Sequence, residues 1–363
     1  LQKIGPTQIG QSRLDSLEAL PTGEVISGDD RSGIRWWTWQ SPPGGMEALM
    51  PASRRVFATG QGAIRALVAI PPQQQSSGNV LSAGADGSLR LLAQEPYALA
   101  QPLYPPQTTA SSPAALTALT AWPQGDIASA YQDGTICWWG SLTDSQKIPT
   151  PTCRRLPEGV SSTVLAALGT EQELISASTD GFLRWWNKDQ AIPRLSEQPP
   201  VGRASNPIRA MLLLNNTDLV TGDSQGALQW WSSRGERKGF AIPSGADPVR
   251  LMIALDSHNL VSVSGIPEQL GWWKNGILRT FRKDPTQQSR LTSISRWSGQ
   301  DVITGGSSGL IQQWREGKRI GDPIQTDHAS GVWAMLKLNS RPFQSAVLLT
   351  AGEQGEIGVW NSG

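Results

Sequence analysis

Two stretches of the sequence follow one pattern: DGTICWW at Asp133–Trp139 and DGFLRWW at Asp180–Trp186. Each begins with Asp-Gly, a dipeptide typical of tight β-turns, and each ends with two adjacent tryptophans. Their final tryptophans stand 47 residues apart. Two matches at this distance indicate an internal repeat, so further copies are expected.

Six more copies of the pattern lie elsewhere in the chain. In chain order the eight copies end at Trp37, Leu92, Trp139, Trp186, Trp231, Trp273, Trp314 and Trp360, at spacings of 41 to 55 residues. Leucine-rich and ankyrin repeats are shorter, at roughly 20–33 residues, and are excluded. Each copy has an apolar alternation, a turn signal and a second apolar alternation, which predicts a β-hairpin.

Each hairpin is preceded by a nearly continuous apolar segment, such as IRALVAIP from Ile64, which is typical of a strand covered on both faces. A less regular outer strand is expected after each hairpin, for example at Arg54–Thr59 and Lys318–Gln325. Four antiparallel strands per repeat predict a propeller blade. We therefore predict an all-β fold, a single β-propeller of eight four-stranded blades over residues 1–363, with seven blades as the alternative.

The two ends of the chain are expected to meet. No outer strand follows the last hairpin, and Lys3-Ile4-Gly5 echoes Lys318–Gly321. Residues 1–10 are therefore predicted to form the outer strand of the last blade.

The tryptophans are predicted to be structural. Twelve of the 16 occupy hairpin ends, where adjacent residues point to opposite faces of a sheet. Each member of a pair can then fill the gap to a different neighbouring blade. The structural set is Trp37, Trp139, Trp186, Trp231, Trp273, Trp314 and Trp360.

Composition narrows the function. With 31 basic and 30 acidic residues the net charge is +1, so no sequence-wide basic field attracts nucleic acid or an anionic membrane. No apolar run is long enough for membrane insertion. Cys137 and Cys153 form neither a CxxC pair nor a disulfide framework, which favours the cytoplasm, although an extracytoplasmic location stays open. Two distant histidines predict no metal site, and no cofactor is expected.

The hairpins resemble the WD-repeat propeller family. That family places Ser or Thr on the second strand, Asp-Gly at the turn and Trp six residues after the Asp, as in Ser129 with Asp133–Trp139 and Ser176 with Asp180–Trp186. The family's Gly-His dipeptide is absent. Only His328 stands in its place, where the resemblance implies a hydrogen-bond network with Thr350 and Trp360. Most blades therefore lack the full network and are expected to depend on tryptophan packing.

An enzyme is the least favoured interpretation. The chain has no nucleophile elbow, P-loop, HExxH or calcium loop. Quinoprotein dehydrogenases also have eight Trp-bearing blades, but their longer docking motif and adjacent cysteines are missing here. We therefore expect no catalytic residues, and His258 is expected to be a solvated turn residue.

The WD-repeat resemblance places one residue per blade at the rim of a central channel, where partners of that family dock. These positions are Asp15, Arg65, Thr117, Leu165, Arg209, Arg250, Thr292 and Trp333. Arg and Trp are enriched in binding hot spots, so Arg65, Arg209, Arg250 and Trp333 are predicted to bind an acidic or peptide-like partner. The alternative is that these arginines only pair with polar neighbours. The long connection Thr38–Arg55 is a second candidate, as a binding loop or a disordered insertion.

The leading functional hypothesis is a non-enzymatic protein-interaction scaffold or sensor, part of a larger bacterial signalling or regulatory protein. This follows from resemblance to propellers attached to such proteins. The alternative is a propeller that binds a small molecule or glycan between blades or on exposed Trp39, Trp122 and Trp297.

Overall fold

The computed structural model describes seventeen segments of the chain: residues 1–3, 12–20, 23–40, 48–70, 79–92, 102–105, 114–140, 150–169, 173–187, 193–196, 206–214, 218–243, 247–265, 269–283, 290–328, 330–338 and 346–361. The chain divides into two compact units. Unit 1 comprises residues 1–103 and 285–363, and unit 2 comprises residues 104–284.

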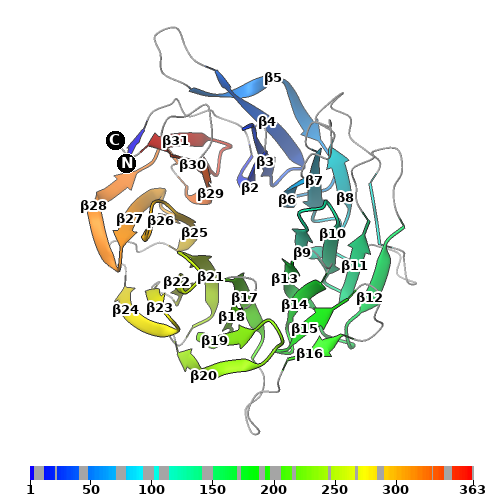
Figure 1. The fold of residues 1–363 in the computed structure, drawn as a ribbon. Coiled ribbons are helices and arrows are strands. Elements are labelled where there is room, and N and C mark those ends of the chain that lie inside the picture. Colours follow the sequence, from blue (N-terminus) through cyan, green and yellow to red (C-terminus); the bar gives the residue numbers. More distant parts are fainter. Residues whose placement is uncertain are drawn as a thin grey trace. The chain divides into compact units, whose positions relative to one another are not determined.

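Unit 1 contains four antiparallel sheets, called blades 7, 8, 1 and 2 after their order in the chain (Figure 1). Blade 7 consists of β25 (Leu291–Arg296), β26 (Asp301–Gly306), β27 (Leu310–Arg315) and β28 (Lys318–Gln325); blade 8 of β29 (Val332–Leu338), β30 (Val347–Gly352), β31 (Ile357–Asn361) and β1 (Gln2–Lys3); blade 1 of β2 (Leu14–Ala19), β3 (Val25–Asp29), β4 (Gly33–Gln40) and β5 (Ala48–Ala58); and blade 2 of β6 (Ile64–Ile70), β7 (Asn79–Gly84) and β8 (Leu89–Leu92).

Unit 2 contains the other four sheets, blades 3 to 6. Blade 3 consists of β9 (Leu116–Ala121), β10 (Ile127–Tyr131), β11 (Thr135–Trp139) and β12 (Thr152–Arg155); blade 4 of β13 (Ser162–Leu168), β14 (Glu173–Ser178), β15 (Leu183–Trp186) and β16 (Arg194–Leu195); blade 5 of β17 (Ile208–Leu213), β18 (Asp218–Asp223), β19 (Ala227–Ser232) and β20 (Arg237–Pro243); and blade 6 of β21 (Val249–Ala254), β22 (Asn259–Ser264), β23 (Gln269–Lys274) and β24 (Ile277–Lys283).

The fold is an all-β, eight-bladed β-propeller, and the described residues contain no helix. The alternative of seven blades is wrong. The N-terminal strand also pairs as predicted, because Gln2 lies opposite Asn361 and Lys3 opposite Trp360 in blade 8. Residues 4–10, also assigned to this outer strand, lie outside the described residues. The description of residues 1–363 as one domain stays a prediction.

Blade 2 differs from the expected pattern of four strands, and blade 1 differs in the length of its outer strands. In blade 2 only three strands are described, and Leu103 adds a single bridge to Leu89. In blade 1 the segment Thr38–Arg55 is largely strand, because β4 continues to Gln40 and β5 already begins at Ala48 (Figure 1). The described part of Thr38–Arg55 is therefore strand and not a disordered insertion, and residues 41–47 lie outside the description. Binding by this segment stays a prediction.

The paired tryptophans fill the gaps between blades, as predicted. Trp138 of blade 3 and Trp186 of blade 4 share one hydrophobic cluster, with ring centroids 5.8 Å apart. Trp185, on the opposite face of β15, packs in the next cluster with Trp231 of blade 5. The first indole of a pair thus faces the following blade and the second faces the preceding one. All seven predicted structural tryptophans are buried, at 1–4% exposure.

The second tryptophan of each pair also makes a buried hydrogen bond within its own blade. In seven blades an indole Nε1 donates to a Ser or Thr hydroxyl on the second strand, at 2.8–3.0 Å. The pairs are Trp37–Ser27, Trp139–Ser129, Trp186–Ser176, Trp231–Thr221, Trp273–Ser262, Trp314–Thr304 and Trp360–Thr350. Because two buried polar groups satisfy each other, the indole is held in one orientation inside the core.

Blade 2, which has Leu92 in place of tryptophan, satisfies its hydroxyl differently. Ser82 Oγ donates to Gln61 Oε1 at 2.7 Å, and Gln61 Nε2 donates to Ser88 O at 2.9 Å. Gln61 is fully buried against Gly84. Blade 2 therefore does not depend on a tryptophan, because a glutamine forms its polar network.

Two tryptophans expected to be exposed are buried. Trp122 is 1% exposed and Trp297 is 4% exposed. Each follows an inner strand, and its backbone NH donates to the carbonyl four residues on, which directs the ring into an inter-blade cluster. They therefore offer no surface for stacking a ligand. The side chain of Trp39 lies outside the description.

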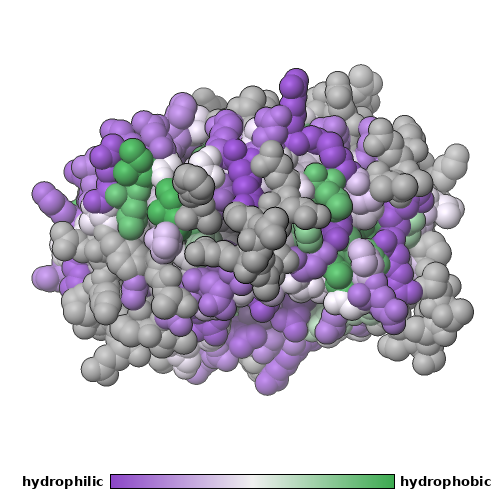
Figure 2. Space-filling view, turned by 90° about the horizontal axis from the view of Figure 1, so that it is seen from below, coloured by the Kyte–Doolittle hydropathy of each residue, from purple (hydrophilic) through white to green (hydrophobic). Residues whose placement is uncertain are grey.

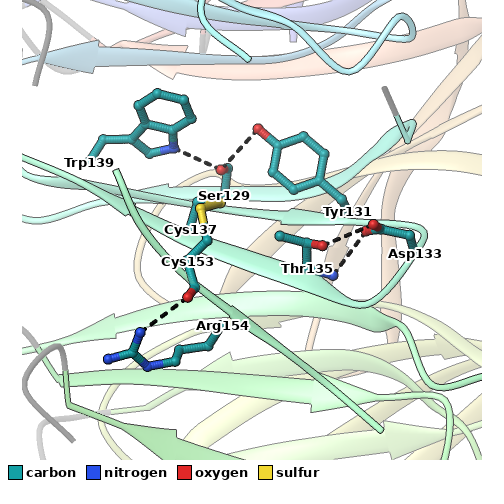
Figure 3. Close-up of a disulfide and its surroundings, with 8 residues drawn as sticks. All are labelled: Ser129, Tyr131, Asp133, Thr135, Cys137, Trp139, Cys153 and Arg154. Carbon is teal, nitrogen blue, oxygen red and sulfur yellow. Dashed lines mark hydrogen bonds between the residues drawn. A yellow bond between two sulfur atoms is a disulfide. The ribbon is translucent and has the colours of Figure 1, made fainter. Parts of the chain in front are cut away.

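Cys137 and Cys153 form a disulfide between β11 and β12 (Figure 3). The absence of a CxxC pair did not exclude it, because the antiparallel register places residues 16 apart in sequence directly opposite each other. Nearby, Ser129 Oγ accepts from Trp139 and donates to Tyr131 OH at 3.2 Å. A cytoplasmic location was predicted because the sequence shows no disulfide framework, and this disulfide removes that reason. The location itself stays a prediction.

Truncating a wedge tryptophan is expected to be severe. Trp139→Ala or Trp186→Ala should lower the free energy of unfolding by about 3–5 kcal/mol, because each removes a buried ring and leaves a hydroxyl without its donor. Chemical denaturation measures this loss. Ile277→Ala, at a side chain 53% exposed, is the control and should change stability little. Near-wild-type stability of both tryptophan variants would contradict the packing described.

The disulfide is expected to stabilise blade 3. Closing a loop of 16 residues contributes roughly 3 kcal/mol in the chain-entropy model, so reductant should lower the unfolding free energy of the wild type by about 2–3 kcal/mol. Cys153→Ala should show the same loss without reductant and no further loss with it. Equal stability of the oxidised and reduced wild type would show that the bond contributes nothing.

Candidate binding surfaces

Every inner strand carries a β-bulge near its first residue. At each bulge the register with the second strand skips one residue, which is left out of the hydrogen-bond ladder and re-aimed by the local bend. In unit 1 the bulged residues are Thr292, Trp333, Asp15 and Arg65, on blades 7, 8, 1 and 2. In unit 2 they are Thr117, Thr163, Arg209 and Arg250, on blades 3 to 6.

Seven of the eight rim positions expected from sequence are bulged residues, and the eighth is a correction. Blade 4 places Thr163 at its bulge, not Leu165. Leu165 is 7% exposed and packs in the cluster between blades 3 and 4. The strand begins at Ser162, two residues before its apolar run, so the apolar pattern alone places the start of blade 4 too late.

In unit 2 the bulge positions hold two threonines and two arginines, and Thr163 is bonded whereas Thr117 is exposed. Thr163 Oγ1 donates to Ile208 O of the next blade at 2.7 Å, so this side chain holds two blades together. Arg209 is exposed and Arg250 is half-buried, and their strands β17 and β21 lie side by side. The two arginines predicted to bind a partner therefore stand at equivalent positions on neighbouring blades.

Unit 1 contains the other two predicted binding residues. Trp333 is half-buried on blade 8, and the Arg13 guanidinium lies 4.8 Å from the centre of its ring. Arg13 also pairs with Asp15, the bulged residue of blade 1, at 2.6 Å. Arg65 is exposed on blade 2. Trp333 and Arg65 are separated by blade 1, and Asp15 with Arg13 continues the row between them.

The alternative role for the bulge arginines, pairing with polar neighbours, differs from blade to blade. Thr292 Oγ1 donates to Val332 O and is structural, like Thr163. Among the described residues Arg65 and Arg209 have no hydrogen bond or ion pair. Sequence reasoning missed Arg13, since only the structure shows its position between Asp15 and Trp333.

No catalytic constellation stands out in the segments described above. Ser257 Oγ lies 2.6 Å from His258 Nδ1, but the Asp256 carboxylate accepts from backbone NH groups of the same turn and from Asn259 Nδ2. It therefore does not orient the imidazole as a Ser-His-Asp triad requires. His258 is exposed in this turn, as predicted.

Metal-binding clusters and membrane-spanning helices are both absent from the described residues. These residues contain no group of three or more His, Cys, Asp or Glu side chains that could hold a metal ion. None of their elements is a helix with the length and apolar character that crossing a membrane requires.

Exposed apolar surface is scattered. On the face in Figure 2 hydrophobic residues form small separate patches among hydrophilic ones. In the described part of the chain only Tyr104, Leu195 and Ile277 are large hydrophobic side chains with high exposure. Such isolated residues do not make a broad hydrophobic interface in the segments described.

His328 joins the buried network that the family resemblance implied. His328 Nε2 lies 2.8 Å from Thr350 Oγ1, which also accepts from Trp360 at 2.9 Å. Glu356 is 5% exposed, and its carboxylate lies 3.8 Å from His328 Nδ1. Burial lowers the pKa of His328, and the carboxylates of Glu356 and Asp327 oppose that shift. His328 is thus a core residue and offers nothing to a substrate.

Comparison with known proteins relates this chain to others by fold alone. No protein-family model matches it, and no curated protein matches its sequence. A computationally designed protein, Ika8, is similar in structure with a TM-score of 0.73 and 20% identity, over 99% of this chain and all of that one. Sqt1 of Saccharomyces cerevisiae is similar with a TM-score of 0.77 and 13% sequence identity, over 99% of each chain. The WD40 β-propeller domain of Doa1 is similar with a TM-score of 0.53 and 13% sequence identity, over 83% of this chain and 93% of that one.

The network around His328 is expected to make stability depend on pH. Since its pKa is lower in the folded than in the unfolded chain, the unfolded chain binds the proton more readily. The free energy of unfolding should therefore fall as pH drops below about 6.5. His328→Gln, which places in blade 8 the residue type that Gln61 supplies in blade 2, should reduce this dependence in denaturation curves between pH 5 and 8. An unchanged dependence would contradict the assignment.

Proposed function

We propose that this chain is a non-enzymatic interaction module of the WD-repeat type that binds an acidic or peptide-like protein partner. Arg65, Arg209, Arg250 and Trp333 contact the partner. The observation that carries this proposal is the bulge on each inner strand, because it takes one side chain per blade out of the hydrogen-bond ladder at equivalent places. A residue at such a place can contact a partner without disturbing its sheet.

The residues at these places favour an acidic partner. Arg209 and Arg250 occupy neighbouring blades of unit 2, and an exposed guanidinium presents a planar fork that matches a carboxylate. In unit 1 Trp333 adds an aromatic surface with Arg13 at its ring. Arg and Trp are the residue types that most often dominate binding energy. Threonines bonded to the next blade mark the positions that serve structure.

The WD-repeat type is supported by the buried networks. Seven blades hold a Trp–Ser/Thr hydrogen bond, and blade 8 adds His328 to it. A similar fold in the WD40 domain of Doa1 agrees with this proposal. Membership of a larger bacterial signalling or regulatory protein remains an expectation, and the gene's flanking coding sequence would test it.

The test compares affinities of defined variants for acidic peptides. Peptides rich in Glu and Asp are arrayed, and the best binder is titrated by calorimetry against the wild type. Arg209→Ala/Arg250→Ala should weaken binding at least about tenfold, since each charged contact contributes on the order of 1.5–3 kcal/mol. Adding Arg65→Ala and Trp333→Ala should weaken it further, and binding should fall with salt.

A matched pair of variants controls for loss of positive charge alone. Arg155→Ala/Arg279→Ala removes two exposed arginines from outer strands β12 and β24 and should leave affinity unchanged. Unaltered binding by the quadruple variant would refute the proposed contact set. Equal losses in both variant pairs would show a non-specific charge effect, which also contradicts it.

A further inference from the structure

The gap between blades 5 and 6 differs from two other gaps at one residue. After the inner strand, blades 3 and 7 place Trp122 and Trp297, each with its NH bonded to the carbonyl four residues on. Both indoles fill the clusters toward the following blade. Blade 5 makes the same turn bond from Leu214 to Asp218 but has no tryptophan there. Blades 1 and 6 also have a leucine at this turn, but Leu20 and Leu255 are buried, whereas Leu214 is only partly buried among the described residues.

The outer strand of blade 5 widens this space. Between Leu228 and Trp230 the register with β20 skips, because Leu228 lies opposite Ile242 while Trp230 lies opposite Lys238. Gln229 fills the resulting bulge through Nε2, which donates to Trp230 O at 2.8 Å. Leu214 and residues of β20 (Lys238, Gly239 and Ile242) line a pocket of about 510 Å³ in unit 2. This volume lies in the usual range for small-molecule sites, roughly 300–1,000 Å³.

The wall of the pocket is apolar on one side. Leu214, Ile242 and the ring of Trp230 line it, and Trp230 is 8% exposed beside Trp273, whose ring centre is 5.4 Å away. Gly276 lies over the same indole, where an added Cβ would come within 3.8 Å of the ring. A rigid aromatic and aliphatic wall of this kind suits the C–H face of a ring.

The rest of the lining carries hydrogen-bonding groups, and its Lys238 and Asp218 charges cancel. The Lys238 ammonium pairs with the Asp218 carboxylate, so a charged ligand would have to compete with an ion pair already formed. His258 Nδ1 lies 2.6 Å from Ser257 Oγ, and both residues line the pocket. Asn275 adds an amide with both donor and acceptor.

We propose that this pocket binds a neutral carbohydrate of one or two sugar rings. Such a ligand has an apolar ring face for the Trp230 wall and hydroxyl groups for Asp218, His258 and Asn275. The pocket lies at the far end of β17 from Arg209, about 17 Å along the strand at roughly 3.3 Å per residue. The inference therefore does not depend on the partner-binding positions and gives the module a second, separate ligand.

Calorimetry with maltose, cellobiose and lactose tests the proposal on the full chain, with adenosine and inorganic phosphate as probes of other ligand classes. At least one disaccharide should bind saturably with one site. Leu214→Trp, which supplies the indole found in blades 3 and 7, should close the pocket and reduce affinity at least tenfold without lowering the melting temperature. Asn275→Gly, at a backbone φ of 52°, should also weaken binding and cause no strain.

Arg155→Ala, at an exposed residue of β12 in blade 3 that does not line the pocket, is the control and should bind the sugar as the wild type does. Absence of saturable binding by all three disaccharides would overturn the proposal, as would binding that Leu214→Trp and Asn275→Gly leave unchanged. Stronger binding of phosphate or adenosine than of any sugar, lost in the same variants, would show a different ligand class and equally refute it. If Leu214→Trp lowers the melting temperature, its loss of binding could come from misfolding, and the result with Asn275→Gly then decides, because the Asn275 side chain is exposed.

Discussion

The hydrogen bond from an indole to a hydroxyl inside seven of the eight blades is the constraint on which this structure depends. A buried Ser or Thr on the second strand needs a partner, and a buried indole needs an acceptor, so each satisfies the other at one geometry. The bond fixes the second tryptophan of a pair toward the preceding blade. Its neighbour in sequence must then face the following blade, and the alternation of a single strand fills two gaps at once.

Much of the fold follows from this logic and was predictable. The hairpin repeat, the inner apolar strand and β28 at Lys318–Gln325 agree with the sequence pattern. The N-terminal pairing in blade 8 also does. The disulfide was missed because cysteines opposite each other across a ladder are distant in sequence. Gln61 was missed for a similar reason, since a glutamine in a loop carries no signal that it reaches a buried serine on another strand.

The candidate binding positions were predictable only in part. Family resemblance indicated one residue per blade, but the apolar run of blade 4 begins after its strand does, so Leu165 was chosen where Thr163 stands. Exposure of Trp122 and Trp297 was misjudged because neighbouring polar residues suggest a surface turn, whereas the turn bond directs both rings inward. Local pattern identifies an element well and the direction of a side chain at its end poorly.

The bulges also separate two selective pressures. A residue in the hydrogen-bond ladder must fit its cross-strand partner, and a tryptophan between blades must fit the adjoining sheet. Neither kind of residue can therefore change freely. The bulged side chain has no partner in the ladder, and across the eight blades this place holds Asp, Thr, Arg or Trp. Residues at the bulges that make no bond to the next blade, unlike Thr163 and Thr292, can therefore be exchanged over evolution while the framework stays intact.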